Sequence, residues 1–182
     1  NGKDLANEHK TLALLPPIVI IPPGKGVSAE VLREQQLSEA KVFQQEIYTY
    51  LLKRKSKGQM SIDIQEIEST NVLLLRNNLD ISNMTTEEIC ELLNVDAVIY
   101  SEFVVPIRQS FFTSLLSSMI FDSDSPDTEI IMSLSIKDCD EKTLMWKYDN
   151  EESAGIIFTS QKSIILSLLT NATREMPYFK DN

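Results

Sequence analysis

Residues 97–105 read Ala-Val-Ile-Tyr-Ser-Glu-Phe-Val-Val, the strongest strand signal in a chain of 182 residues. The run is apolar at most positions, which is typical of a strand that is covered on both faces of a sheet. It follows a predicted helix that starts at Thr85-Thr86-Glu87-Glu88, a capping-type pattern, and runs through Leu93. Asn94-Val95-Asp96 turns this helix directly into the strand, so the two elements are joined by a very short connection.

The elements upstream of this strand alternate between strand and helix. They are a short buried strand at residues 11–15, an edge or irregular piece at 18–21, a long helix at 28–55 capped by Ser28, a half-exposed strand at 60–68, and a short helix from Asn71 to Asn78. Proline cannot donate to a strand ladder, so Pro16-Pro17 and Pro22-Pro23 confine residues 18–21 to an edge. This order favours right-handed crossovers and parallel pairing.

The downstream half has a different pattern. Two strands at residues 129–137 and 143–150 are joined by a polar hairpin turn, and a helix at about 160–175 ends near Pro177. We therefore predict an α/β fold with a single domain, a mixed sheet of about five strands with flanking helices, and a C-terminal β-hairpin plus helix. The domain is expected to span residues 11–180, and the polar residues 1–10 to form a flexible tether.

Composition limits the partners and the compartment. With 17 Lys and Arg against 27 Asp and Glu, the net charge of −10 disfavours nucleic acid and anionic lipid as broad-surface partners. No apolar run reaches the ~20 residues that a membrane helix needs. Two cysteines, Cys90 and Cys139, are too few for a disulfide framework. They could pair or stay free, and we expect two free, partly buried thiols.

The residues that usually carry catalysis are scarce. The single histidine, His9, lies in the expected tether, which argues against Ser–His and Cys–His pairs and multi-histidine metal sites. Asp122, Asp124, Asp127 and Glu129 lack the glycine and the glutamate of a calcium-binding loop, so we interpret them as a solvated loop, with a weak cation site as the alternative. We expect no enzyme, no cofactor and no metal, and the alternative is an acid pair that the fold brings together from distant parts of the chain.

Residues 107–121 are apolar and rich in serine, and they allow two interpretations. A helix here is too short to span a bilayer. It would be either a buried helix that covers the sheet or an exposed apolar segment that docks a partner, another copy or a membrane. The candidate interaction residues are Phe111, Phe112, Leu115, Leu116, Met119 and Phe121.

A second hypothesis is a small-ligand-binding protein or a degenerate enzyme. Open α/β sheets bind ligands at the carboxyl ends of their strands, near a topological switch. That rule places Ser101, Glu102 or the loop after Leu15 near the pocket.

The chain resembles the small bacterial envelope lipoproteins related to the curli-secretion lipoprotein, the CsgG-like family, and to the N-terminal domain of TolB. Four segments carry the resemblance: the opening strand with Pro16-Pro17, the step from Leu93 to Ile99, the hairpin strand from Lys142 to Tyr148, and the closing Met176-Pro177-Tyr178-Phe179. Within them we expect structural roles for two residues. Asp96 can hold its turn through its own backbone bonds, and Trp146 can cover one face of the hairpin.

The resemblance implies a non-catalytic lipoprotein at the periplasmic face of the outer membrane of a Gram-negative bacterium. It implies a tether through a lipidated cysteine upstream of Asn1, and partners that are other copies of the chain or other envelope proteins. Two departures argue against pore formation. Related proteins often have glycine where Ser101 stands, and the chain lacks the long inserts that form transmembrane hairpins in the secretion pore.

Overall fold

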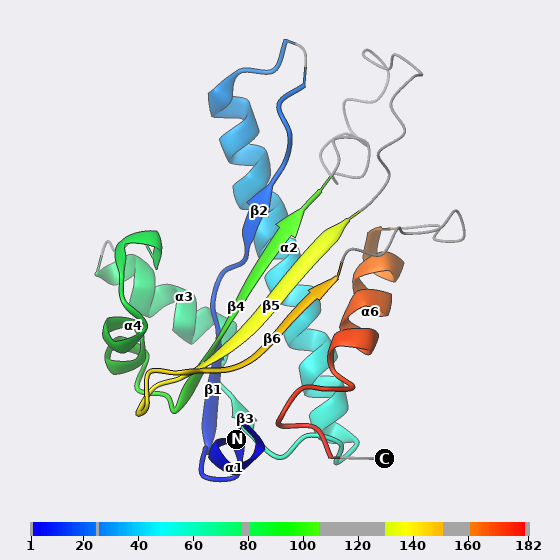
Figure 1. Cartoon of the computed structure of the whole chain (residues 1–182). Helices are drawn as coiled ribbons and strands as arrows, with labels where there is room; N and C mark the ends of the chain where they lie inside the picture. The colour runs from blue at the N-terminus through cyan, green and yellow to red at the C-terminus, as the bar shows by residue number, and fades with distance from the viewer. Residues whose placement is uncertain (1, 25, 78–80, 106–129, 151–160, 181–182) are drawn as a thin grey trace.

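The computed structural model describes residues 2–24, 26–77, 81–105, 130–150 and 161–180 (Figure 1). Its six-stranded mixed sheet has the order β3-β1-β4-β5-β6, with β2 paired to β4 beyond the end of β1. The elements are α1 (Gly2–Ala6), β1 (Thr11–Leu14), β2 (Ile18–Ile20), α2 (Ala29–Ser56), β3 (Asp63–Ile64), α3 (Ile67–Arg76), η1 (Ile81–Asn83), α4 (Thr86–Leu93), β4 (Ala97–Val104), β5 (Ile131–Asp138), β6 (Leu144–Asn150) and α6 (Gln161–Ala172). The predicted fold class, including the hairpin and the final helix, is confirmed.

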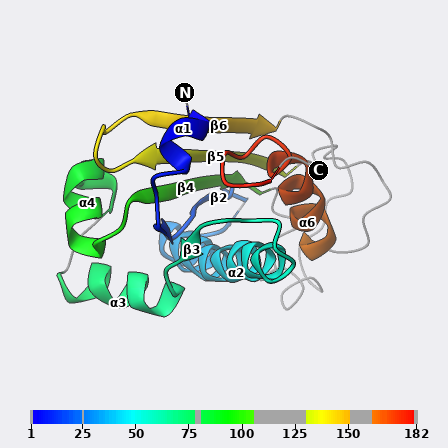
Figure 2. The same ribbon diagram turned by 90° about the horizontal axis from the view of Figure 1, so that it is seen from below.

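β4 is the central strand because its residues are apolar toward both faces. It pairs in parallel with β1 and β2 on one edge and antiparallel with β5 on the other. Ala97, Ile99 and Phe103 face the larger core, which α2 and α6 complete, whereas Val98 faces a smaller core under α3 and α4. Seen from below, α3 and α4 lie on one side of the sheet and α6 on the other (Figure 2).

Pro16-Pro17 interrupt the edge beside β4. Leu14 is paired with Ile99 and Ile18 with Glu102, so three residues, 15–17, lie opposite only two, 100–101. This is the residue count of a β-bulge, and prolines are tolerated there because they have no N–H to donate. β1 and β2 are therefore two pieces of one broken edge, and the prediction of an edge piece at 18–21 is confirmed.

Helix caps and a buried stripe explain helices α2 and α4. The Ser28 side chain accepts a hydrogen bond from Val31 N at the start of α2. At the start of α4, Thr85 and Glu88 form a reciprocal capping box, and Asn94 ends the helix in the left-handed conformation with a φ of 52°. The buried residues Phe43, Ile47 and Leu51 of α2 contribute to the larger core.

The strand that we predicted at 60–68 is wrong in its extent. β3 contains only Asp63–Ile64, and Ile67 already begins α3, four residues before the predicted start at Asn71. The reason lies in the spacing of buried residues. Ile67, Thr70 and Leu74 are buried at helical intervals, and this helical period overlaps the alternating pattern of Ile62 and Ile64.

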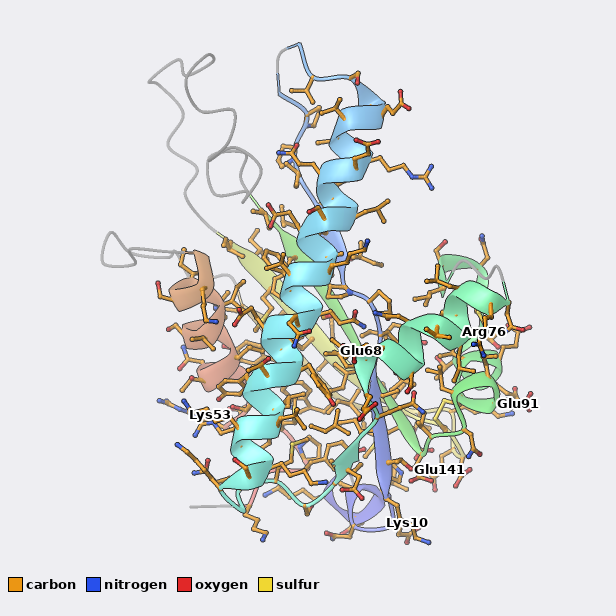
Figure 3. The ribbon with its side chains drawn as sticks, turned by 180° about the vertical axis from the view of Figure 1, so that it is seen from behind. Lys10, Lys53, Glu68, Arg76, Glu91 and Glu141 are labelled. Carbon is orange, nitrogen blue, oxygen red and sulfur yellow. A yellow bond between two sulfur atoms is a disulfide. The ribbon has the colours of Figure 1, made fainter. Side chains whose placement is uncertain are left out.

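The expectation of free thiols is also wrong, because Cys90 and Cys139 form a disulfide with 5.7 Å between their Cα atoms. Cys90 lies in the last turn of α4, and Cys139 follows directly after β5. The short connection from α4 into β4 and the antiparallel pairing of β4 with β5 bring these two ends together. In the view from behind, Glu91 and Glu141 mark the two sides of this link (Figure 3).

The N-terminal residues differ from the tether that we expected. Gly2–Ala6 form the short helix α1, which packs against β6, and Ala6 is buried in the larger core. A Cβ added at Gly2 would lie 2.5 Å from the Met145 backbone oxygen, so the close approach of α1 to this edge strand requires glycine. Within the described residues, no helix combines the length and the apolar character needed to cross a membrane.

Candidate binding groove and buried histidine network

A groove with a volume of about 850 Å³ opens where the β1–β2 bulge meets α2 and α3. Its walls come from residues 15–18, the middle of α2, the end of α3, η1 and the start of α4, and from β4 and β5. The volume is in the range typical of small-ligand sites. Residues 15–18 line the groove, so it lies where the pairing with β4 is interrupted between β1 and β2.

Ser101, Glu102 and the loop after Leu15, which the second hypothesis named, lie together in this groove. Neighbouring residues of a strand point to opposite faces. Ser101 therefore points toward α2, as Ile99 and Phe103 do, and Tyr100 and Glu102 point to the side that carries α3 and α4. The groove reaches both sides of the sheet at the bulge.

The hydroxyl of Ser101 is the notable polar group of the groove. Ser101 is 5% exposed, and among the residues that the structure describes its Oγ finds no hydrogen-bond partner. An unsatisfied buried hydroxyl costs about 1–3 kcal/mol, so a group that entered the groove and bonded to it would gain affinity.

Two amides fix the width of the groove. Gln44 Nε2 of α2 donates to Asn71 Oδ1 of α3 at 3.1 Å, and Asn71 Nδ2 donates back to Gln44 Oε1 at 2.8 Å. Gln44 Nε2 also donates to Leu14 O at 3.0 Å, which ties both helices to the end of β1. Gln44 is buried, and these partners occupy its oxygen and both of its N–H groups. The pair therefore positions the walls and offers little to a ligand.

The far end of the groove is polar. Tyr100 OH lies 3.1 Å from Thr86 Oγ1, and the Lys137 ammonium lies 4.6 Å from the centre of the Tyr100 ring. These contacts hold the aromatic ring between α4 and β5. The rim of the groove therefore carries the phenol of Tyr100, the ammonium of Lys137 and the carboxylate of Glu102.

A second hollow, of about 500 Å³, lies among Arg54, Arg174 and Lys180 near the last turns of α2 and α6. Arg54 donates to Gln59 Oε1 at 3.1 Å and lies 4.9 Å from the centre of the Tyr50 ring. Cations suit the carbonyl ends of helices, so this cluster is explained by helix stability.

His9 joins three distant parts of the chain. Its Nε2 lies 2.7 Å from Asp138 Oδ2, and its Nδ1 lies 2.7 Å from Tyr178 OH. The side chains of His9 and Asp138 are 5% and 1% exposed. Burial, followed by the nearby carboxylates of Asp138 and Asp96, raises the pKa of the Tyr178 hydroxyl. We did not expect this network, because a lone histidine near one end of the chain gives no signal of its partners.

Asp96 reaches the first strand. Its Oδ2 accepts hydrogen bonds from the backbone N–H groups of Lys10 and Thr11, both at 2.7 Å, and from Thr11 Oγ1 at 3.1 Å. Partial burial acts to raise the pKa of the Asp96 carboxyl, but the hydrogen bonds from Thr11 and Lys10 outweigh it, so the pKa is lowered. We expected Asp96 to bond within its own turn. These three bonds instead anchor the start of β1.

The remaining predicted residues separate into two groups. Trp146 is half-buried on β6, and its ring stacks with that of Tyr148 at 6.2 Å between centroids. The six candidate interaction residues and the acidic residues 122–129 lie outside the residues that the structure describes. In the described part of the chain, no three His, Cys, Asp or Glu side chains gather in a way that could hold a metal ion.

Comparison with known proteins gives a likeness of fold only. No family model and no curated protein sequence matches the chain. Its structure is similar to that of lipoprotein GNA1162 from Neisseria meningitidis, with a TM-score of 0.51, 10% identity, and coverage of 92% of this chain and 99% of that chain. The C-terminal domain of LpoB from Salmonella enterica matches with a TM-score of 0.41 and 9% identity over 81% of this chain and 92% of that chain.

Proposed function

We propose that the chain is a non-catalytic interaction domain of a lipid-anchored protein at the periplasmic face of the outer membrane of a Gram-negative bacterium. The observation that supports this most is the fold shared with lipoprotein GNA1162, which extends over 92% of this chain and 99% of that one. That neighbour is a lipoprotein, which supports a lipid anchor here, and the apolar side chains exposed at the groove support an interaction role.

The disulfide supports the compartment. Disulfides persist in oxidising environments such as the bacterial periplasm and are rare in the cytosol. Cys90 and Cys139 connect α4 to the β5–β6 turn, far apart in sequence, and they leave no free cysteine. A bond of this structural kind agrees with a periplasmic location.

The use of the polar side chains supports the absence of catalysis. His9, Asp138 and Tyr178 bond to one another in the interior, and the Asp96 carboxylate bonds to backbone groups of the first strand. In each case the hydrogen bonds join segments of the fold.

Metabolic labelling with palmitate tests the anchor and the location. The full-length native protein is labelled in cells, the envelope is fractionated, and the same domain behind a signal peptide without a lipidated cysteine is the control. We expect label in the outer-membrane fraction for the native protein and none for the control. An unlabelled cytosolic protein would overturn the proposal, as would in-cell crosslinking that joins the domain to no other protein chain.

A second candidate function is the binding of a small molecule in the groove, and the unpartnered hydroxyl of Ser101 favours it. A thermal-shift screen of metabolites discriminates between the two functions. Small-molecule binding predicts a compound that raises the melting temperature of the native chain and has a weaker effect on Ser101→Ala. A screen in which every compound acts equally on both proteins would exclude this candidate.

A further inference from the structure

We infer that the groove at the β1–β2 bulge is a docking site for residues 107–121 of a second copy of this chain. The inference rests on the proposed interaction function and adds the two surfaces that meet. The groove belongs to the described structure, and the occupant is known from its sequence.

The first argument is the concentration of exposed apolar side chains on the elements that border the groove. Ten large apolar side chains are exposed in the described part of the chain, and six of them lie on β2, the first half of α2 and α3. Ile18, Leu37 and Leu75 line the groove itself, with exposed fractions of 55%, 56% and 76%. Apolar patches of this kind mark interaction sites.

The second argument is the unused hydrogen-bonding capacity of the same edge. Among the described strands β2 pairs only with β4, so its outer side is open to an added segment. The Ser101 hydroxyl within the groove is also unpartnered in the described structure. A peptide that enters the groove brings backbone carbonyls that can accept from this hydroxyl, which a purely apolar ligand cannot do.

Charge complementarity selects the occupant. The charged residues lining the groove are Lys41, Lys137 and Glu102, a balance of +1 in a chain with a net charge of −10. Residues 107–121 carry a single charge, Arg108, and they are followed by four acidic residues at 122, 124, 127 and 129. An apolar segment with an acidic flank fits an apolar groove that is rimmed by two lysines.

The position of the segment in the fold agrees with this pairing. Val104 of β4 is paired with Ile131 of β5, so the residues between them leave and re-enter the sheet at one point. Val104 is also paired with Ile20, the last residue of β2, so that point lies at the same end of the sheet as the exposed β2 edge. A contact between this insertion and the groove of another copy joins two different surfaces, which makes it heterologous and able to propagate into a ring or a filament.

Photo-crosslinking from the full-length chain tests the inference. A photoreactive phenylalanine derivative replaces Phe112, equal amounts of ¹⁴N- and ¹⁵N-labelled protein are mixed, and the adducts are mapped by mass spectrometry. We expect mixed-isotope adducts that join residue 112 to peptides of the groove, such as those containing Leu37 or Leu75. Adducts within single chains only, adducts to another surface, or no adduct would each overturn the inference.

Matched variants separate docking from folding. Leu37→Glu and Leu75→Glu place charge on exposed groove residues, and we expect each to lower the yield of mixed adducts about tenfold, as for a central contact of an interface. Leu144→Glu changes a leucine that is 56% exposed on β6, outside the groove, and should leave the yield unchanged. Equal losses in all three variants would contradict a specific site.

The outcome also separates this inference from the proposed function. A palmitate-labelled protein that crosslinks to another envelope protein and forms no mixed adducts would refute self-docking and leave the proposed function standing. An unlabelled cytosolic protein that forms mixed adducts at the groove would do the reverse.

Discussion

His9 Nε2 lies 2.7 Å from Asp138 Oδ2, across a separation of 129 residues. Through this contact the segment that precedes β1 is fixed to the end of β5, and through Tyr178 it is fixed to the C-terminal segment as well. The adjacent residue, Cys139, is bonded to α4 by the disulfide. The end of the sheet at which β5 finishes is therefore held by a polar network at Asp138 and by a disulfide at the adjacent Cys139.

Replacement of His9 by alanine should lower the free energy of unfolding by about 3 kcal/mol. The cost arises because Asp138, which is 1% exposed, loses a partner while its carboxylate stays buried. Urea denaturation measures it. Asp138→Asn removes the buried charge, so the double variant His9→Ala/Asp138→Asn should be destabilised by less than the sum of the single variants. Additive losses would show that the two side chains do not act together.

Loss of the disulfide should also destabilise the fold. Cys90 and Cys139 are separated by 49 residues, and the loop-closure argument for a loop of this length gives about 4 kcal/mol. We expect Cys90→Ala/Cys139→Ala to unfold at a lower urea concentration than the native chain under oxidising conditions. A reducing agent should lower the midpoint of the native chain and leave that of the double variant unchanged. A native midpoint that is insensitive to reduction would contradict the pairing.

The Asp96 carboxylate should contribute a pH-dependent part of the stability. Its pKa in the folded chain is lowered, so its contribution is complete above the unfolded pKa of about 3.9 and is lost as the pH falls through the lower folded value. We expect the difference in unfolding free energy between the native chain and Asp96→Asn to shrink as the pH falls below about 4. Urea melts from pH 7 to pH 2 measure this difference, and a constant difference would exclude the hydrogen-bonded carboxylate as its source.

Local patterns predicted most of the fold, because caps and periodicity act within a few residues. Ser28 and Thr85 identified two helix starts, and the apolar run at 97–105 identified the central strand. The error at Ile67 arose where two periods overlap, and only burial against α2 and β1 decides between them. Such a decision depends on packing partners that are distant in the sequence.

The candidate site was predictable only in part. Ser101 was visible as a polar residue in an apolar run, and its place beside the Pro16-Pro17 break follows from parallel pairing. Leu37 and Leu75 could not be assigned to the groove from sequence, because which helical residues remain exposed depends on the packing angles of α2 and α3. The partners of His9 were equally inaccessible, since they lie on separate segments far along the chain.

Replacement of Ser101 by alanine provides the sharpest test of the groove itself. If the buried hydroxyl is unsatisfied in the isolated chain, Ser101→Ala removes a desolvated polar group and should raise the free energy of unfolding by about 1 kcal/mol. Ser135→Ala, at a half-buried position on the neighbouring strand, is the matched control and should change it by less than about 0.5 kcal/mol. Thermal unfolding of dilute protein measures the effect of each substitution in the isolated chain. The same measurement at high protein concentration measures the effect when two copies can dock. Because docking of a second copy would satisfy the hydroxyl, the advantage of alanine should shrink as the concentration rises. If the native chain and Ser101→Ala have the same free energy of unfolding at every concentration, ordered water already satisfies the hydroxyl. A partner that bonded to this hydroxyl would then gain no affinity from it.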